Sequence, residues 1–191
     1  MSQNKTKNLY VKSLLILCSL SFGFLGCEHL NKSHNHKVQS EAHGDVVIES
    51  RSGNKTVKGQ IHFMYQNEIL NMTAKIEGLK PNSTHGFHIH EVGDCTALDA
   101  TTAGGHFSPN TGNKHSSHTD PNRHAGDLGN IKSDKNGVAE ISLTLPGLNL
   151  SSSDKTYSVL GRAIIVHADP DDMVTQPTGN SGARIGCGVI K

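Results

Sequence analysis

The sequence predicts an all-β protein, and three observations support that prediction. Short runs alternate apolar and polar residues, the period of two that places every second side chain on one face of a strand. Turn-forming residues such as Ser52-Gly53-Asn54 and Gln66-Asn67 separate these runs. No segment keeps a helical period over several turns.

The first 27 residues have the pattern of an export signal. Three lysines precede an apolar run over 14–25, which is too short to span a bilayer stably. The string FLGC over 24–27 resembles the bacterial lipoprotein box, which implies cleavage before Cys27 and lipidation of its thiol. An ordinary secretory signal, with Cys27 incidental, is the alternative.

Residues 28–44 carry no hydrophobic periodicity and are predicted to form a flexible linker. This linker contains His29, His34, His36 and His43. It could be an arm that collects metal ions for a site behind it, or a solvated tether whose histidines have no role.

From residue 45 onward the chain has the strand pattern described above. Ile61, Phe63 and Tyr65 share one face of the second run, with His62 on the outer face. The predicted strands cover 46–48, 56–66, 69–76, 86–90, 137–145 and 157–166. Two long loops, roughly 91–131 and 168–184, are rich in Gly, Asn, Asp, Pro and Ser. Loops of that length in a compact domain are usually functional or disordered.

Charge and cysteine content narrow the class of protein. Without residues 1–27 the chain loses three of its 18 basic residues and none of its 17 acidic ones, leaving a formal net charge of −2. This charge is not that of a nucleic-acid-binding protein, and the sequence contains no stripe of basic residues that would indicate one. About 164 residues remain, enough for one domain with an adequate core.

Export would place the chain in an oxidising compartment, where Cys95 and Cys187 are the two cysteines of its body. One disulfide between them would close a loop of about ninety residues, worth ~4 kcal/mol in the chain-entropy model. Two free thiols, or a thiol pair that binds copper, are the alternatives.

Histidine is frequent, with 13 in 191 residues, and its placement indicates metal binding. His88 and His90 alternate around Ile89 on one predicted strand, so the two rings share a face about 7 Å apart and can converge on one ion. His167 ends another predicted strand and could supply a third nitrogen. A lone pair of alternating histidines would more often be ordinary packing. The long loop, however, adds four ligand-type residues spaced by nine, nine and three positions: His106, His115, His124 and Asp127. Copper and zinc bind to such nitrogen and carboxylate donors.

Over essentially all of 45–191 the residues resemble the Cu,Zn superoxide dismutase family. The motifs that carry the resemblance are GFHIH (86–90) with GDC (93–95), AGGHFSP (103–109), RHAGDLGN (123–130), GRAIIVHADPDD (161–172) and GNSGARIGCGVI (179–190). The resemblance implies an eight-stranded antiparallel Greek-key barrel, an immunoglobulin-like sandwich, whose two long loops hold the metals.

The resemblance also implies a role for each matching residue. The copper ligands would be His88, His90, His106 and His167, and the zinc ligands His106, His115, His124 and Asp127. His106 would bridge both metals and take part in catalysis by exchanging a proton, and Arg184 would bind the anionic substrate. Asp171 would link His88 and His115 through their far nitrogens. His85 would be structural, and His118 is the rival of His115 for the zinc position.

The implied activity is dismutation of superoxide to oxygen and hydrogen peroxide. The export signal and the lipoprotein box would place it in the periplasm or cell envelope, and Glu28 after Cys27 favours a lipid anchor in the outer membrane. The resemblance also allows a homodimer. One position departs from the family: many members have a lysine where this chain has Pro177, so electrostatic guidance of superoxide is expected to be weak. The alternative function is a non-catalytic envelope lipoprotein that binds or stores copper, although such a protein would need neither the arginine nor zinc.

Overall fold

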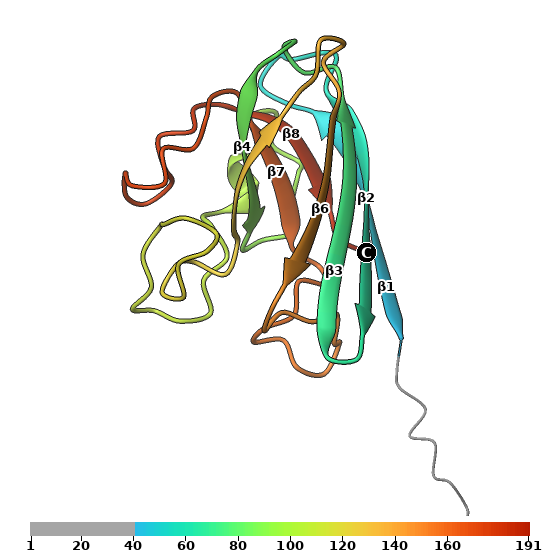
Figure 1. Ribbon diagram of the computed structural model, residues 1–191, viewed down its shortest axis with the longest axis vertical. Helices are drawn as coiled ribbons and strands as arrows, with labels where there is room; N and C mark the ends of the chain where they lie inside the picture. Colours follow the sequence, from blue (N-terminus) through green and yellow to red (C-terminus); the bar gives the residue numbers. More distant parts are fainter. Residues whose placement is uncertain (1–40) are drawn as a thin grey trace, which may run out of the picture. The chain divides into compact units, whose positions relative to one another are not determined.

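Eight antiparallel strands form a nearly closed barrel in the computed structural model, which describes residues 41–191 (Figure 1). The strands are β1 (Ala42–Ser50), β2 (Lys58–Gln66), β3 (Ile69–Glu77), β4 (Thr84–His90), β5 (Asp127–Lys132), β6 (Ala139–Leu145), β7 (Ala163–His167) and β8 (Arg184–Val189). The only helical element in this part of the chain is a 3₁₀ turn, Thr101–Ala103. The prediction of an all-β fold is confirmed.

The strand order has the Greek-key form that the family resemblance implies. Neighbouring strands follow the order β5-β4-β7-β8-β1-β2-β3-β6, and β5 and β6, at its two ends, also contact each other. The first three strands are joined as hairpins, whereas the chain then leaves β3 to form β4 on the other side of the barrel. Within 41–191 no helix is long and apolar enough to cross a membrane.

Alternation along the strands builds the core. Ile61 and Phe63 on β2 are almost fully buried, while His62 between them faces solvent, as the sequence predicts. Inward residues of the other strands join the same apolar cluster, including Phe87 and Ile89 of β4. This cluster fills the barrel, so every polar site must lie on its outer surface or at its ends.

Two strands were not predicted from the alternation pattern. β5 falls at the end of the predicted loop 91–131, so Asp127 begins a strand, and β8 begins at the end of the predicted loop 168–184. Both strands are short and contain glycine, and side chains on both faces of β5 are buried, which removes the alternation that marks a strand. The predicted strand 157–166 was also wrong in its first half, because the chain turns over 157–162 and β7 starts at Ala163.

The first strand starts earlier than predicted. β1 begins at Ala42, so His43 belongs to the barrel and not to the linker 28–44. Gly44 is buried between exposed neighbours, and because it has no side chain it hid the alternation from the sequence pattern. The predicted signal segment, Cys27 and the histidines before Glu41 lie outside the described residues.

A disulfide fastens the loop after β4 to the last strand. The Cys95 and Cys187 sulfurs are bonded, which confirms the predicted pairing across 92 residues. Cys187 packs with Ala100, Ala103, Ala163 and Ile165 in a small apolar cluster of its own. The loop is therefore held against the outer faces of β7 and β8.

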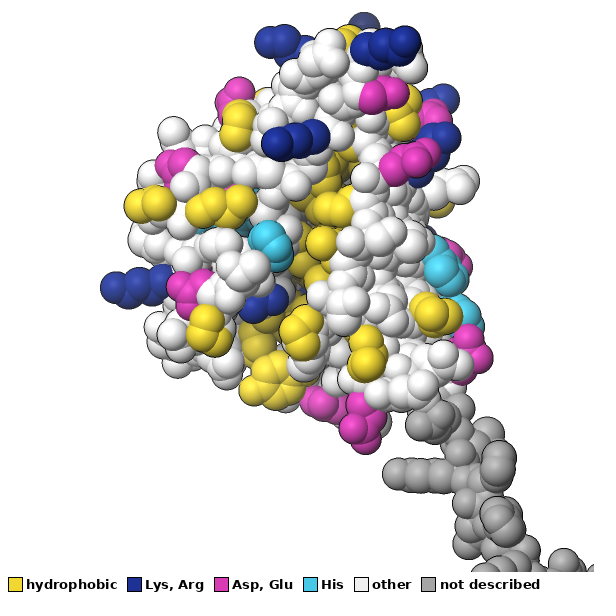
Figure 2. Space-filling model, viewed as in Figure 1, with side chains coloured by type: hydrophobic (Ala, Val, Ile, Leu, Met, Phe, Trp, Pro, Cys, Tyr) yellow, Lys and Arg dark blue, Asp and Glu magenta, His cyan; other side chains and the backbone are white. Residues whose placement is uncertain are grey.

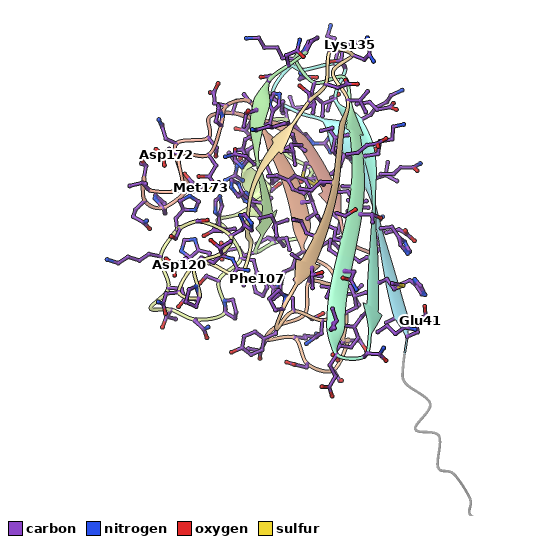
Figure 3. All side chains as sticks on the ribbon, in the orientation of Figure 1. Glu41, Phe107, Asp120, Lys135, Asp172 and Met173 are labelled. Atoms are coloured by element: carbon purple, nitrogen blue, oxygen red, sulfur yellow. A yellow bond between two sulfur atoms is a disulfide. The ribbon has the colours of Figure 1, made fainter. Side chains whose placement is uncertain are left out.

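β4 presents two different faces to its surroundings. Phe87 and Ile89 point into the core, and His88 and His90 point out, yet all four are fully buried. The histidine face is covered because the two long loops, which carry Asp120 and Asp172, lie on the same side of the barrel (Figures 1 and 3). A polar, water-shielded space thus forms between barrel and loops.

Candidate metal centre

Four histidines from three segments converge outside the barrel. We call His88, His90, His106 and His167 the four-histidine cluster; one ligand atom from each lies within 4.8 Å of all the others. Two come from β4, one from the long loop and one from the end of β7. A register irregularity lies next to His88 in the β4–β5 pairing, and another lies next to His167 in the β7–β8 pairing. Bulges of this kind re-aim side chains beside functional sites.

Hydrogen bonds fix which nitrogen each ring presents. The far nitrogen of His88 donates to Asp171, that of His90 to the Gly104 carbonyl and that of His167 to the Gly182 carbonyl, at 2.8, 3.0 and 3.3 Å. The opposite nitrogens are buried without any partner: His88 Nδ1, His90 Nε2, His106 Nε2 and His167 Nε2. Buried polar atoms normally have partners, so four orphaned lone pairs in one place fit a bound metal ion.

A second group lies directly beside the first. We call His106, His115, His124 and Asp127 the carboxylate cluster, and its ligand atoms also lie within 4.8 Å of one another. Asp127 Oδ1 is 2.7 Å from Nδ1 of His106, 3.0 Å from that of His115 and 3.6 Å from that of His124. Three imidazoles and one carboxylate around a point are a donor set that suits tetrahedral zinc.

The backbone orients that carboxylate. Asp127 Oδ2 accepts the main-chain N–H groups of Ser116 and His124, both at 3.1 Å, which leaves Oδ1 to face the rings. The Asp127 side chain is fully buried. The His118 side chain is exposed and takes no part in either cluster, so the structure brings His115 and not its rival into the site.

His106 belongs to both clusters. Its Nδ1 faces Asp127 and its Nε2 is the orphaned nitrogen in the four-histidine cluster. The His106 ring centroid is 4.0 Å from that of His88 and 5.3 Å from that of His115. One ring can therefore contact two cations, one on each nitrogen, as the family resemblance implies.

Asp171 joins the two clusters from behind. Its Oδ2 accepts His88 Nε2–H and its Oδ1 accepts His115 Nε2–H, both at 2.8 Å. The side-chain amide of Asn130 makes two 2.8 Å bonds to the Asp171 backbone. Gly179 has a positive φ, and a Cβ there would lie 2.0 Å from Asp171 Oδ1, so only glycine fits at this approach.

The second long loop has a further attachment that the sequence did not reveal. The Gln176 side chain donates to the His115 carbonyl at 2.7 Å and accepts the His115 N–H at 2.9 Å. Gln176 thus fixes the backbone of a candidate zinc ligand, as Asn130 fixes the backbone of Asp171. Neither Asn130 nor Gln176 belongs to a sequence motif of metal ligands. Each hydrogen-bonds to a segment tens of residues away, so no local pattern in the sequence reveals its role.

Arg184 is half-buried at the start of β8 and is held by the disulfide-anchored loop. Its Nη1 and Nη2 donate to the carbonyls of Ala100 and Gly104, each at 2.8 Å. Gly104 O is also the acceptor of His90, so guanidinium and cluster share one carbonyl. Two of five N–H donors are bound, and the others remain to hold an anion.

The protonation states differ between the clusters. Burial lowers the pKa of His88 to about 4 and also lowers the pKa of His90 and of His167, so these rings are neutral near pH 7, the form that binds metals. Burial also acts against protonation of His115, but Asp127 and Asp171 outweigh it and raise the His115 pKa to about 9. Burial likewise opposes ionisation of both carboxyls, yet their bonds to histidine hold each pKa below its usual value.

His85 is the remaining buried histidine near the site. Its Nδ1 lies 2.9 Å from the His167 carbonyl, so it contacts the strand end that carries a cluster member. Its other nitrogen lies outside both clusters and, among the described residues, has no partner. His85 thus links β4 to the end of the neighbouring strand β7, a contact that fits the structural role predicted for it.

Comparison with known proteins identifies relatives of this site. The copper/zinc superoxide dismutase family model matches residues 57–190. Copper/zinc superoxide dismutase 3 of Arabidopsis thaliana is 43% identical over 146 residues, covering 73% of this chain and 85% of the relative. The copper/zinc superoxide dismutase of Paramecium bursaria Chlorella virus 1 is 44% identical over 140 residues, 70% of this chain and 72% of the relative.

Solved structures share the fold. A double mutant of a superoxide dismutase-like protein from Bacillus subtilis aligns with a TM-score of 0.66 and 36% identity, covering 75% of this chain and 94% of that one. The clock protein EA4 aligns with a TM-score of 0.68 and 33% identity, covering 78% and 92%.

Proposed function

Because this chain belongs to the copper/zinc superoxide dismutase family, with copper and zinc as cofactors and superoxide dismutation as its activity, we propose that the four-histidine cluster holds copper and the carboxylate cluster holds zinc. The observation that carries this division is the set of four buried, unpartnered imidazole nitrogens with no carboxylate among them. All-nitrogen donors suit copper, whereas three imidazoles and a carboxylate complete a closed zinc site.

A bound copper ion supplies the one-electron chemistry that oxidises one superoxide to oxygen and reduces the next to peroxide. The protein must then supply protons and hold an anion. His106 Nε2 is the atom placed to hold a proton, because it is buried, has no partner and belongs to a ring whose other nitrogen faces Asp127. A proton on this nitrogen is shielded from bulk water and lies within the four-histidine cluster.

Arg184 is proposed to hold superoxide beside the copper ligands. Its pKa is lowered by burial but starts from 12.5, so the group stays charged. Two carbonyl acceptors lock its plane, and one of them, Gly104 O, also accepts the His90 N–H, so the guanidinium lies beside a member of the four-histidine cluster. A fixed cation with free N–H donors favours small anions over neutral molecules.

Metal content and superoxide decay together test the assignment. Purified protein loaded with both metals is expected to contain one copper and one zinc per chain by mass spectrometry, and to remove superoxide in pulse radiolysis. His167→Ala should lose copper and nearly all activity but keep zinc, and His124→Ala should lose zinc first. Full activity in His167→Ala would disprove the copper assignment, and loading without turnover in the unaltered protein would instead support a copper-binding lipoprotein.

We further propose that the enzyme acts in the cell envelope, anchored through Cys27 and protecting that compartment from superoxide. Support comes from the apolar run that ends in FLGC and from the disulfide, which persists where thiols are oxidised. The Cys27→Ser variant is expected to lose the lipid mass and move from the membrane fraction to the soluble one. An unlipidated mature chain in the membrane-free fraction of unaltered cells would refute the anchor.

A further inference from the structure

A second pair of histidines lies on the barrel away from the metal centre. His43 on β1 and His62 on β2 are diagonal neighbours on the outer surface, with His43 Nδ1 3.3 Å from His62 Nε2. Each side chain is 49% exposed. Glu41, next to this pair, lies at the start of β1, on the opposite side of the barrel from the loops that carry Asp120 and Asp172 (Figure 3).

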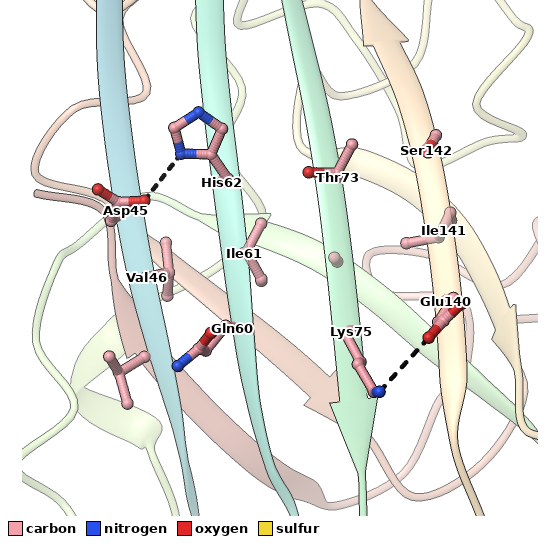
Figure 4. A pocket seen from close by; sticks show the side chains of 12 residues that line it. Asp45, Val46, Gln60, Ile61, His62, Thr73, Lys75, Glu140, Ile141 and Ser142 are labelled. Atoms are coloured by element: carbon pink, nitrogen blue, oxygen red, sulfur yellow. Dashed lines mark hydrogen bonds and ion pairs between the residues drawn. The ribbon is translucent and has the colours of Figure 1, made fainter.

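A carboxylate lies beside each ring of this pair. His62 Nδ1 lies 2.9 Å from Asp45 Oδ1 (Figure 4), and His43 Nε2 lies 3.3 Å from Glu41 Oε1. Asp45 accepts the His62 Nδ1–H, so His62 Nε2 presents a lone pair to His43 Nδ1, whereas Glu41 is an ion-pair neighbour of His43. The two facing nitrogens can share one proton, and a divalent cation can take the place of that proton.

We propose that His43 and His62 form a surface site for a borderline divalent cation, copper(II) or zinc, separate from the catalytic metals. Imidazole nitrogens bound to one such ion at about 2.0–2.1 Å and the tetrahedral angle are ~3.3 Å apart, which is the distance observed. Water completes the coordination, because both rings are half exposed.

The contacts of the candidate metal centre offer a comparison within the same molecule. The centroids of His43 and His62 are 5.3 Å apart, as are those of His106 and His115, although the first pair is stacked at 27° and the second lies edge-on at 73°. The Asp45–His62 contact also repeats the Asp171–His88 arrangement, in which a carboxylate holds the far side of a ligating ring. Such partners raise ligand basicity.

The surroundings also suit a cation. Acidic and histidine side chains meet at the surface near the first two strands (Figure 2), and Glu41 and Asp45 supply two negative charges within contact distance of the rings. Three further histidines precede Glu41 in the sequence, at 29, 34 and 36. Because these three histidines could bind metal themselves, they must be replaced before metal binding by His43 and His62 is measured.

Equilibrium dialysis against copper(II) at neutral pH tests the site. The full chain, loaded with its catalytic copper and zinc and carrying alanine at positions 29, 34 and 36, is expected to bind one additional copper per chain. His62→Ala and His43→Ala should each weaken that binding at least tenfold while leaving superoxide removal unchanged. Asp45→Ala should weaken it to a smaller extent, because the His62 tautomer is no longer fixed.

Gln60→Ala is the matched control. Gln60 lies on β2, on the same exposed face two residues from His62, and should bind copper as the parent does. Absence of an additional copper in the parent chain, or equal binding by the His62→Ala variant, would overturn the site. Because the dialysis counts copper bound beyond the metals already loaded, its result does not depend on which cluster holds copper and which holds zinc.

Discussion

At the scale of single residues, the metal centre depends on which of the two ring nitrogens of each histidine carries the proton. Asp171 and the carbonyls of Gly104 and Gly182 accept ring N–H groups, and so select the opposite nitrogens to point toward the metals. These acceptors make no contribution as ligands of copper, yet without them each neutral ring could present either nitrogen. Ligand residues alone therefore do not define the site.

We expect Asp171→Ala to weaken zinc binding by about 10–100-fold. His115 would lose the acceptor of its Nε2–H, and its other nitrogen would no longer be held toward the carboxylate cluster. Competition with a zinc chelator measures the change. Asp172→Ala is the control, because Asp172 is exposed and its carboxylate bonds only within its own loop, to Val174 and Thr175. Equal zinc affinities in both variants would contradict this role.

The candidate ligands and Asp171 were predictable from sequence, but the other supports were not. His88 and His90 were placed on one face by strand periodicity alone, whereas the division into two clusters came from the family motifs. Asn130 and Gln176 could not be found, since they act through contacts with segments 41 and 61 positions away. Such long-range contacts leave no local pattern.

At the scale of elements, how well the sequence predicted a strand depended largely on whether one of its two faces is exposed to solvent. β2 and β3 each have one solvent-exposed face, and the alternation of apolar and polar residues predicted their ends to within two residues. β5 and β8 bury glycines and pack under loops, so they show no period of two and were missed. The strands that carry function are thus the ones hardest to see, because covering the metal centre buries their outer face.

The disulfide connects stability to the substrate-binding element. Replacing both Cys95 and Cys187 by alanine should lower the free energy of unfolding by about 2–5 kcal/mol, because a 92-residue loop gains freedom in the unfolded chain. Urea denaturation measures this loss. The activity per bound copper should also fall, since the loop that supplies the Ala100 and Gly104 carbonyls to Arg184 is released.

The exposed neighbour Thr96 provides the control for that prediction. Thr96→Ala alters the same loop without changing the bridge, and should keep both stability and activity. If the double cysteine variant lost stability but kept full activity per copper, the loop would not be what orients Arg184.

At the scale of the whole molecule, the metal-free protein should lose stability in acid. His88 has a pKa of about 4 when folded and 6.5 when unfolded, so between those values the unfolded chain binds more protons. Its contribution is therefore complete above pH 6.5 and is lost as the pH falls toward 4. His90 and His167, with lowered pKa values, act in the same direction.

His115 has the opposite sign. Its pKa is raised to about 9, so its contribution is complete below pH 6.5 and disappears as the pH rises through 9. The free energy of unfolding of chelator-treated protein, measured by urea denaturation, should hence peak near neutrality and fall toward pH 5, by about 1.4 kcal/mol per pH unit for each net proton. His88→Gln should flatten the acid limb. A stability that rises on acidification would contradict the neutral, buried state of these rings.

The charge around the centre predicts how superoxide arrives. The loop between β7 and β8 carries exposed Asp169 and Asp172 and no lysine, and the next cation along the chain is the half-buried Arg184 at the start of β8. A single recessed charge facing acidic neighbours attracts an anion weakly beyond a Debye length of about 10 Å at 0.1 M salt. We therefore expect kcat/KM for superoxide to change little between low and moderate ionic strength.

Adding a cation to that loop tests whether its charge is the reason. Val174 is 74% exposed, and Val174→Lys should raise kcat/KM at low salt and make it fall as salt is added. Val47→Lys gives the same net charge on β1, where the side chain is 65% exposed on the barrel strand that pairs with β2, and should leave the salt dependence flat. A steep decline with salt in the unaltered enzyme would show that basic groups elsewhere guide superoxide to Arg184.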